Sequence, residues 1–302
     1  MRITILGNNS AIPACGRHPT AQIVEIREQL LLVDCGEGTQ IQMQRYGIRT
    51  RRIHHIFISH LHGDHYFGLI GLLTSMGLHG RTEPIHLYGP PKLMDIINLQ
   101  LDAAATVLPY TIHFIPIDDE EDCKELLNTR YITVSCFSTE HRIPCHGFVF
   151  ESKKSGRVLL PEACKAYEIP AAFYARLKEG EDYTHKNGEL VKNEWVTSDP
   201  PPSKKYAYCA DTLYTESFMT HISGVDIMYH ESTYLHDLAQ RARDRFHTTA
   251  LEAAQLAQKA GVKRLLLGHF SSKYEDLSVF EQEARSIFSA TEVTQEGMSF
   301  EV

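Results

Sequence analysis

The sequence predicts an α/β protein, and the alternation of strand-like and helix-like segments along the chain predicts it most directly. Short aliphatic and β-branched runs recur from the first residues onward, and longer amphipathic segments separate several of them. The chain has 302 residues, of which 43% are hydrophobic and 23% charged, so it can bury a large core and is not expected to be disordered. The sequence shows no repeat of the kind that marks a solenoid. These observations favour α/β layers over an all-β sandwich.

Each expected strand is a short apolar run that ends in turn-forming residues or a polar loop. The expected strands are 2–6, 22–25, 30–33, 53–59, 85–88, 111–117, 131–137, 147–151, 206–210, 226–229 and 264–267. The expected helices are 40–45, one that begins near Tyr66, 92–105, 248–260 and 275–288. The strand 53–59 runs directly into His60. Loops at the carboxyl ends of strands are where α/β proteins usually place their chemistry.

The segment 160–202 differs from the rest of the chain. It is charged and turn-rich, contains Glu179-Gly-Glu-Asp and Lys186-Asn-Gly-Glu, and ends in Asp199-Pro-Pro-Pro. The main strand pattern does not continue through it. We therefore expect a single domain over 1–302 that carries an inserted, flexible arm over 160–202.

Charge and cysteine content narrow the possible functions. The formal net charge of −8 argues against general binding of polyanions through overall charge. The seven cysteines form no C-x-x-C pair, which favours reduced thiols and a cytoplasmic protein over a disulfide framework. The longest apolar runs are strand-sized, and the first residues lack the apolar stretch of a secretory leader. We expect neither a membrane span nor secretion.

Three imidazoles and one carboxylate occur within six positions after the strand 53–59. They form the sequence His60-Leu-His62-Gly-Asp64-His65. Imidazole nitrogen and carboxylate oxygen are ligands for zinc and similar cations, and a loop that offers both can face two neighbouring ions. A solvated polar turn whose histidines merely titrate is the alternative. The density of ligand-type side chains makes that alternative the weaker interpretation.

Three more ligand-type residues, His141, Asp211 and His269, each follow a further expected strand. Alone, each is a weak signal, because an Asp after a strand is often a helix cap and a Gly-His pair is often a turn. Together with the cluster they suffice for two four-coordinate ions if one carboxylate bridges, and paired ions commonly hydrolyse phosphodiesters or amides. The remaining histidines without companion ligands are expected at surface or satisfied polar positions: His54, His55, His79, His86, His113, His185, His221 and His236.

Several motifs along the chain make the resemblance to a known family specific. They are Leu6-Gly with the Pro13 loop, Asp34-Cys-Gly-Glu-Gly-Thr-Gln40, Ser59-His-Leu-His-Gly-Asp-His65, Asp211-Thr, His230-Glu-Ser-Thr233, Phe246-His-Thr-Thr249 and Gly268-His-Phe-Ser-Ser-Lys-Tyr274. With these motifs the sequence resembles the metallo-β-lactamase superfamily and, within it, the short bacterial form of ribonuclease Z (tRNase Z). The resemblance implies a four-layer αββα fold, in which two mixed sheets lie between helices.

The resemblance also implies a role for each candidate site residue. One zinc ion would be held by His60, His62 and His141, the other by Asp64, His65 and His269, and Asp211 would bridge them. Asp64 would also act as general base toward the attacking water. His247, oriented by Glu231, would protonate the 3′-oxygen leaving group. The implied cofactors are two Zn²⁺ per subunit, with Mn²⁺ or Mg²⁺ as alternatives.

Candidate substrate contacts in the core motifs are hydroxyl groups and one arginine. The hydroxyl candidates for phosphate oxygens are Ser232, Thr233, Thr248 and Thr249. Thr249 with Glu252 equally matches a helix-capping box. Arg17 lies where many bacterial members carry Pro-x-Lys-x-Arg-Asn. This chain has Pro13-Ala-Cys-Gly-Arg17-His18 without the lysine, so its response to CCA ends stays open.

The arm corresponds to the segment with which the family grips tRNA. Its Leu177-Lys-Glu-Gly180 motif matches the family, whereas the usual Pro-x-Gly-Pro turn appears here as Pro170-Ala-Ala-Phe, without the Gly-Pro half. The candidate tRNA contacts in the arm are Tyr174, Arg176 and Lys178, through stacking and phosphate binding.

The resemblance implies a zinc-dependent endoribonuclease that removes the 3′ trailer from precursor tRNA by attack of an activated water and leaves a tRNA 3′-hydroxyl. It also implies a homodimer whose partner is precursor tRNA. Two alternatives stay open: a hydrolase of the same fold that acts on a small phosphodiester or ester, and a metal- or RNA-binding protein without turnover. The long arm argues against the first, because a small substrate needs no clamp. The complete ligand set with His247 argues against the second.

Overall fold

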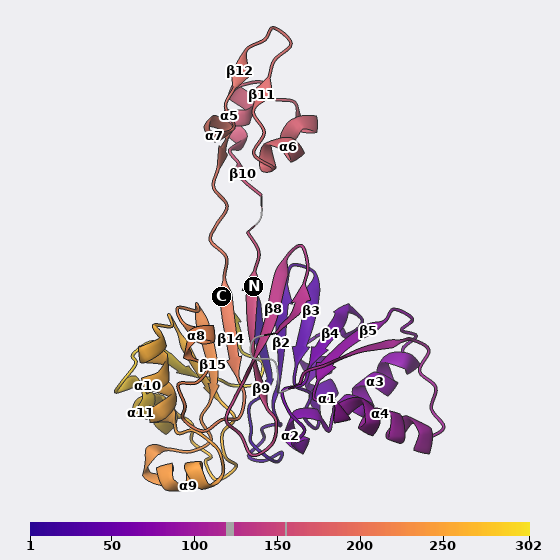
Figure 1. The fold of residues 1–302 in the computed structure, drawn as a ribbon, viewed down its shortest axis with the longest axis vertical. Coiled ribbons are helices and arrows are strands. Elements are labelled where there is room, and N and C mark those ends of the chain that lie inside the picture. Colours follow the sequence, from indigo (N-terminus) through magenta and orange to yellow (C-terminus); the bar gives the residue numbers. More distant parts are fainter. Residues whose placement is uncertain (119–123, 155) are drawn as a thin grey trace. The chain divides into compact units, whose positions relative to one another are not determined.

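The computed structural model describes residues 1–118, 124–154 and 156–302 (Figure 1). The chain divides into two compact units. The first unit combines Met1–Glu151 with Lys204–Val302, and the second is Ser152–Ser203. The expected arm 160–202 lies within the second unit.

The first sheet of the large unit is mixed and has the strand order β18-β1-β2-β3-β4-β5-β6. Its strands are β1 (Arg2–Gly7), β2 (Ala21–Ile26), β3 (Gln29–Val33), β4 (Ile53–Phe57), β5 (Ile85–Gly89), β6 (Ile112–Pro116) and β18 (Ser299–Glu301). Neighbouring strands from β18 to β3 pair antiparallel, and those from β3 to β6 pair parallel. The parallel strands all direct their carboxyl ends to the same edge of the sheet.

The second sheet has the order β17-β16-β15-β14-β9-β8-β7 and is also mixed. Its strands are β7 (Glu125–Asn128), β8 (Ile132–Ser138), β9 (His146–Ser152), β14 (Lys205–Cys209), β15 (Ile227–Glu231), β16 (Leu265–Gly268) and β17 (Thr291–Val293). The strands from β14 to β17 pair parallel, whereas β9 pairs antiparallel with β14.

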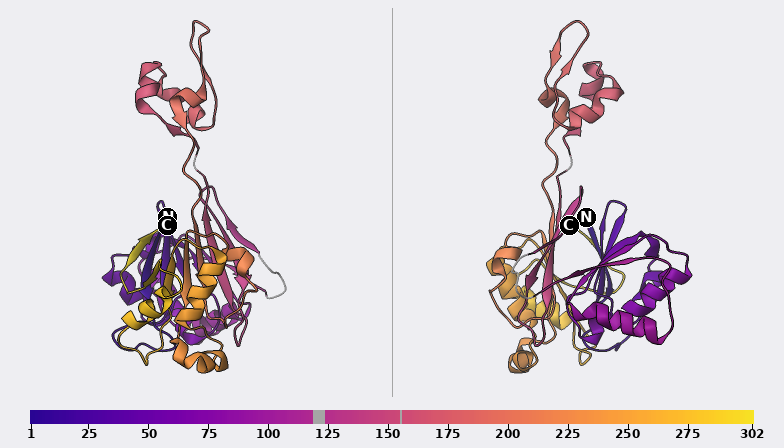
Figure 2. Two further views of the ribbon diagram at one scale, coloured as in Figure 1. Left: turned by 90° about the vertical axis from the view of Figure 1, so that its left-hand side faces the viewer. Right: turned by 45° about the vertical axis from the view of Figure 1, so that its right-hand side comes forward.

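The two sheets pack face to face, and helices cover both outer faces (Figure 1). The layer between the sheets is apolar and includes Ile3 and Val24 from the first sheet and Phe148 and Tyr206 from the second. The helices on the first sheet are α1 (Thr39–Arg45), α3 (Leu69–Leu78) and α4 (Lys92–Ala103); those on the second are α8 (Met219–Ile222), α10 (Ala250–Ala260) and α11 (Ser278–Arg285). Figure 2 shows the same layers from two other sides. The predicted four-layer αββα fold is confirmed.

The second unit has a small core of its own. Its elements are β10 (Val158–Leu159), α5 (Pro161–Ala166), η2 (Ala171–Phe173), α6 (Tyr174–Lys178), β11 (Tyr183–Thr184), β12 (Leu190–Val191), α7 (Asn193–Val196) and β13 (Thr197–Ser198). Cys164, Ile169, Leu177, Val191 and Val196 are buried together. Their burial explains why a charged, turn-rich segment still folds as a compact unit. The strand β10 pairs antiparallel with β13, so the entry and exit of this unit lie side by side.

Some elements depart from the sequence prediction. The helix expected from Tyr66 is preceded by a separate turn, α2 (Gly63–Tyr66), which begins inside the histidine cluster. The strands β7, β17 and β18 were not expected. Each has only three or four residues, which is too short for a periodic pattern to develop. The remaining short helices are η1 (Thr50–Arg52), η3 (His236–Leu238) and α9 (Ala239–Asp244).

Within the described ranges, every helix is too short or too polar to cross a lipid bilayer.

The helix α10 begins with a complete capping box at Thr249. Its side-chain oxygen accepts from the Glu252 backbone N–H at 3.3 Å, and Glu252 Oε2 accepts from the Thr249 N–H at 3.0 Å. We expect Thr249→Ala to lower the free energy of unfolding by about 1 kcal/mol, because the Glu252 backbone N–H loses its acceptor. Urea unfolding monitored by circular dichroism measures the change. Thr249→Ser keeps the capping oxygen and serves as the control; an equal loss in both variants would contradict the capping role.

Candidate metal centre

All the expected ligands lie on loops or turns at the ends of strands. His60 and His62 follow β4, Asp64 and His65 lie in α2, and His141 follows β8. Asp211 follows β14 and His269 directly follows β16. The two sheets therefore contribute to one site, and α2 is labelled near the lower edge of the layers in Figure 1.

A first group of ligand atoms surrounds one oxygen of Asp211. His62 Nδ1 lies 3.1 Å from His60 Nε2 and 3.1 Å from His141 Nε2. Asp211 Oδ2 lies 3.6 Å from His60 Nε2 and 3.8 Å from His141 Nε2. The four side chains therefore present one ligand atom each to a common centre.

A second group surrounds the other oxygen of the same carboxylate. Asp211 Oδ1 lies 3.5 Å from His65 Nε2 and 3.3 Å from His269 Nε2. The two imidazole nitrogens are 3.3 Å apart, and Asp64 Oδ2 lies 3.2 Å from His269 Nε2 and 3.6 Å from His65 Nε2. Asp211 thus turns one oxygen toward each group, as a bridging ligand would.

The donor set and its spacing fit two divalent cations. A tetrahedral zinc with ligand distances of about 2.0–2.1 Å places its ligand atoms about 3.3 Å apart, which is close to the separations in both groups. Three ligands have their other ring nitrogen bonded to a partner that fixes the tautomer. These pairs are His65 Nδ1 with Asp34 Oδ2 (2.7 Å), His141 Nδ1 with the Phe246 carbonyl (2.9 Å) and His269 Nδ1 with Thr233 Oγ1 (2.9 Å). In the neutral rings, the Nε2 atoms of these three histidines therefore carry lone pairs, which are repelled by the neighbouring ligand atoms unless a cation lies between them.

The charges at the centre favour a bound cation as well. Burial would raise the pKa of Asp211, but the imidazoles of His269 and His65 outweigh it and hold that pKa well below its usual value. Burial likewise favours the neutral ring of His65, but Asp211, Asp64 and Asp34 raise its pKa well above its usual value. Buried carboxylates thus create a demand for positive charge, which a divalent ion meets more fully than a proton.

Four non-glycine residues at the site have left-handed backbone. The φ angles are 64° at Ala11, 55° at Asp34, 60° at Phe246 and 58° at His269, and Ala11 donates its N–H to the ligand Asp64. Such backbone costs about 1–3 kcal/mol per residue and persists where the surrounding structure fixes it, often at functional sites. Each of these residues either is a ligand or hydrogen-bonds to one.

The carboxylate of Glu231 organises the residues beside the metal ligands. Its Oε1 lies 3.0 Å from His247 Nδ1 and accepts from the Thr248 N–H at 2.9 Å. Its Oε2 accepts from the Thr233 N–H at 3.0 Å and from the Thr233 hydroxyl at 2.9 Å. Glu231 is buried, and these donors together fix its orientation.

His247 lies next to the ligand groups, but its hydrogen bond is to Glu231, which is not a ligand. Burial would lower its pKa, but the Glu231 carboxylate outweighs burial and raises the pKa to about 9. Asp211, His247 and His269 form a third, overlapping triple of ligand-type atoms. The His247 nitrogen that faces Asp211 is Nδ1, at 4.0 Å from Oδ2, and the same atom is bonded to Glu231, so we leave His247 out of the ligand set.

The hydroxyl candidates are engaged within the protein. All four side chains are buried: Ser232, Thr233, Thr248 and Thr249. Ser232 Oγ donates to the Gly268 carbonyl at 3.1 Å, and Thr248 Oγ1 donates to the Thr212 carbonyl at 2.6 Å. Thr233 bonds Glu231, and Thr249 caps α10. These contacts help to hold the site together, and binding of phosphate oxygens by these residues stays a prediction.

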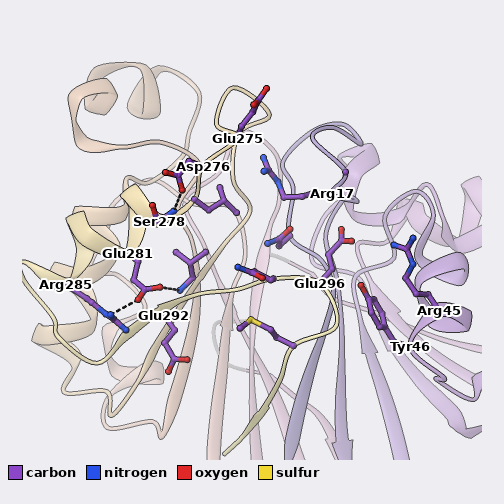
Figure 3. Close-up of a pocket in the computed structure, with 16 residues that line it drawn as sticks. Arg17, Arg45, Tyr46, Glu275, Asp276, Ser278, Glu281, Arg285, Glu292 and Glu296 are labelled. Atoms are coloured by element: carbon purple, nitrogen blue, oxygen red, sulfur yellow. Dashed lines mark hydrogen bonds and ion pairs between the residues drawn. The ribbon is translucent and has the colours of Figure 1, made fainter.

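Arg17 is fixed in a loop that borders an open pocket of about 710 Å³ (Figure 3). Its guanidinium donates to the Tyr274 carbonyl at 2.7 Å and to Asn9 Oδ1 at 2.9 Å. The pocket is lined by charges of both signs, including Arg45 and Glu296. Arg17 thus holds two loops together, and a contact with substrate is a separate prediction.

The arm candidates lie on α6 of the small unit. Arg176 Nε donates to Glu181 Oε2 at 2.7 Å, and its guanidinium lies 4.5 Å from the centroid of the Phe173 ring. Tyr174 is half-buried against the core of this unit, whereas Lys178 is exposed. The pairing with Glu181 reduces the charge that Arg176 offers to a phosphate.

Sequence reasoning missed residues that support the ligands. Asp34, at the end of β3, bonds His65, and Ser59 Oγ lies 3.0 Å from His60 Nδ1. The exposed Arg142 has its guanidinium 3.1 Å from His62 Nε2. Asp34 follows an expected strand, in the motif Asp34-Cys-Gly-Glu-Gly-Thr-Gln40. This position was the one sequence signal that could have identified it as a residue supporting the ligands.

Comparison with known proteins places the chain in a family. A family model described as "Anti-Pycsar protein Apyc1" matches residues 1–155. Ribonuclease Z of Parabacteroides distasonis is 41% identical over 300 residues, covering 99% of this chain and 98% of the relative. Ribonuclease Z of Cytophaga hutchinsonii is 44% identical over 305 residues, covering 99% and 95%.

Solved structures agree with this placement. The short form of human tRNase Z superimposes with a TM-score of 0.72 at 25% identity, covering 100% of this chain and 99% of that chain. The metallo-β-lactamase fold protein YhfI of Bacillus subtilis has a TM-score of 0.69 at 18% identity, covering 99% and 98%, and supports the fold alone. The matched family model ends before Asp211, His247 and His269, whereas the ribonuclease Z relatives span nearly the whole chain. The chain therefore belongs to the ribonuclease Z family of metallo-β-lactamase fold proteins.

Proposed function

We propose that this chain is a metal-dependent endoribonuclease that removes the 3′ trailer from precursor tRNA and leaves a tRNA 3′-hydroxyl. The observation that carries the proposal is that Asp211 turns one carboxylate oxygen toward each of two ligand groups. His247 and Glu231 lie beside these groups. Support comes from the ribonuclease Z relatives, whose similarity extends over both the centre and the arm.

The ligand groups would hold two Zn²⁺ per subunit. His60, His62 and His141 would hold one ion, Asp64, His65 and His269 the other, and Asp211 both. Two such ions, when bound, lower the pKa of a shared water and neutralise charge on the phosphodiester. Mn²⁺ and Mg²⁺ are the alternatives, although five imidazoles among the seven ligands favour zinc over the oxygen-preferring Mg²⁺.

Asp64 would take a proton from the attacking water. Its Oδ2 accepts from the Ala11 backbone N–H at 2.7 Å and faces His269. The loop that carries Ala11 therefore holds this carboxylate in one orientation. A fixed carboxylate beside the attacking water is the geometry that general-base catalysis requires.

His247 would donate a proton to the departing 3′-oxygen. Because Glu231 accepts from Nδ1, the opposite nitrogen Nε2 is the one free to face the substrate. Glu231 acts through His247 and does not itself contact the reacting atoms. The exposed Arg142 beside His62 adds a cation that would bind a phosphate oxygen.

The arm would bind the tRNA body, with Tyr174, Arg176 and Lys178 as its contacts, and Arg17 would contact the acceptor end. We further propose a cytoplasmic homodimer. A chain with net charge −8 needs such local basic groups to bind RNA, since overall charge opposes it.

Removing the arm separates substrate binding from chemistry. The strands β10 and β13 pair at Leu159 and Thr197, so a short Gly-Ser linker in place of 160–196 would close a hairpin without disturbing the large unit. We expect cleavage of precursor tRNA to fall by about 100-fold or more, because the clamp is lost, while hydrolysis of bis(p-nitrophenyl) phosphate changes by less than about twofold.

Lys178→Ala in the intact arm is the matched control and should weaken tRNA binding slightly. Steady-state rates with precursor tRNA and with bis(p-nitrophenyl) phosphate measure how differently the two activities respond. Equal loss of both activities would contradict a substrate-binding role for the arm.

A further inference from the structure

The carboxylate of Asp34 connects one ligand of each ion group. Asp34 is fully buried at the end of β3, and its Oδ2 lies 2.7 Å from His65 Nδ1. The same oxygen accepts from Ser59 Oγ at 2.9 Å, and Ser59 Oγ lies 3.0 Å from His60 Nδ1. Its Oδ1 accepts from the Ser59 backbone N–H at 2.8 Å. One carboxylate thus sets the tautomer of His65 directly and that of His60 through a hydroxyl.

A tyrosine of the opposite sheet holds this carboxylate. Tyr208 lies on β14, and its hydroxyl donates to Asp34 Oδ2 at 2.6 Å across the layer between the sheets. The ring is 1% exposed and stacks on Tyr229, with centroids 5.3 Å apart and planes 12° apart. A buried, stacked ring has little freedom, so its hydroxyl is a fixed donor.

We propose that Tyr208 is a positioning residue for the metal centre, which aligns His65 and His60 by fixing the Asp34 carboxylate from the second sheet. The ligands of the two ion groups come from both sheets, and Asp34 bears the strained backbone described above. Without the tyrosine hydroxyl, Asp34 Oδ2 loses its one donor from the second sheet and keeps only its contacts with Ser59 and His65. The carboxylate is then held less firmly, and so are the two imidazoles that it aligns.

The neighbouring Tyr206 supplies a matched control. It lies two positions earlier on the same strand and the same face, is equally buried, and its hydroxyl donates to Gln22 Oε1. Gln22 is buried in β2 and is not bonded to a metal ligand within the described part of the chain. Tyr206→Phe and Tyr208→Phe therefore remove the same group from equivalent surroundings, and only Tyr208→Phe affects the ligands.

The test measures metal affinity in the absence of RNA. Metal-free protein, prepared by chelation, is titrated with Zn²⁺ in competition with a chromophoric chelator, and the Co²⁺ absorption spectrum is recorded in parallel. We expect Tyr208→Phe to weaken Zn²⁺ binding by about 10- to 100-fold and to alter the Co²⁺ spectrum. Tyr206→Phe should bind within about twofold of the parent protein. Thermal unfolding of the metal-free variants should show similar losses of stability.

Unchanged affinity in Tyr208→Phe, or equal weakening in both variants, would overturn the proposal. Ser59→Ala provides a second route, since it breaks the link from Asp34 to His60 and should also weaken binding. The inference rests on the metal centre of the proposed function. The experiment nevertheless distinguishes a failure of the positioning role from a failure of the proposed function. A parent protein that binds no divalent ion contradicts the proposed function, whereas a parent and a Tyr208→Phe variant that bind equally contradict only the positioning role.

Discussion

Asp211→Ala is expected to remove both metal ions and to reduce precursor-tRNA cleavage by about 10³-fold or more. Each Asp211 oxygen faces one ligand group, so a single substitution removes a ligand from both ions. The buried imidazoles around it would then face one another without the shared negative charge. Metal ions supply several kcal/mol of transition-state stabilisation, and each 1.36 kcal/mol corresponds to a tenfold rate change.

Metal content by mass spectrometry and the rate with bis(p-nitrophenyl) phosphate measure this effect together. Asp226→Ala is the control, because Asp226 is a largely buried carboxylate that bonds Lys263 and the Lys205 backbone, away from the ligands. It should cost stability and leave the metal content unchanged. An Asp211→Ala protein that keeps two ions and most of its activity would disprove the bridging role.

His247→Ala is expected to slow cleavage by about 10²- to 10⁴-fold while the metal content stays at the parent level. The reason is that His247 bonds Glu231 rather than completing either ligand group, so its loss removes a proton donor and no ligand. Single-turnover cleavage of precursor tRNA measures the chemical step. Metal analysis of the same sample tests whether cleavage slows without a loss of metal.

The effect of His247→Ala should depend on the leaving group. Bis(p-nitrophenyl) phosphate expels a phenolate that needs little protonation, so its hydrolysis should fall much less than cleavage of RNA. The control is His236→Ala, which replaces an exposed histidine whose Nδ1 lies 3.2 Å from Thr249 Oγ1. A proportional loss of metal in His247→Ala would show that His247 is a ligand instead.

The main strands were predictable because burial leaves a local signature. Runs such as Arg2–Gly7 and Gln29–Val33 are aliphatic on both faces, as expected for strands between a helix layer and another sheet. The edge strand β18 was not predictable, since three residues carry no pattern and its partner β1 lies at the other end of the chain. Distant pairing of this kind is decided by tertiary structure.

The convergence of the candidate ligands was predictable for a different reason. Imidazole and carboxylate side chains after strands have few roles besides metal binding when they occur together, so residue type and position suffice to predict candidates such as His65 and His269. Their supporting residues were not predictable. Asp34 meets Tyr208 only because two sheets pack face to face, and hydroxyls such as Thr233 can bond either a substrate or the protein.

The most direct test is to map the cleavage of one precursor tRNA, with and without an encoded CCA end, to the nucleotide. The proposed function predicts a single cut just after the discriminator base of the CCA-less precursor, leaving a 3′-hydroxyl. Chelation should abolish the cut, and added Zn²⁺ should restore it. In the same experiment, the CCA-containing precursor shows whether the enzyme cuts or rejects CCA ends when the loop Pro13–His18 lacks the family's lysine. An intact precursor, under conditions in which bis(p-nitrophenyl) phosphate is hydrolysed, would contradict the account and indicate a small-molecule hydrolase of the same fold.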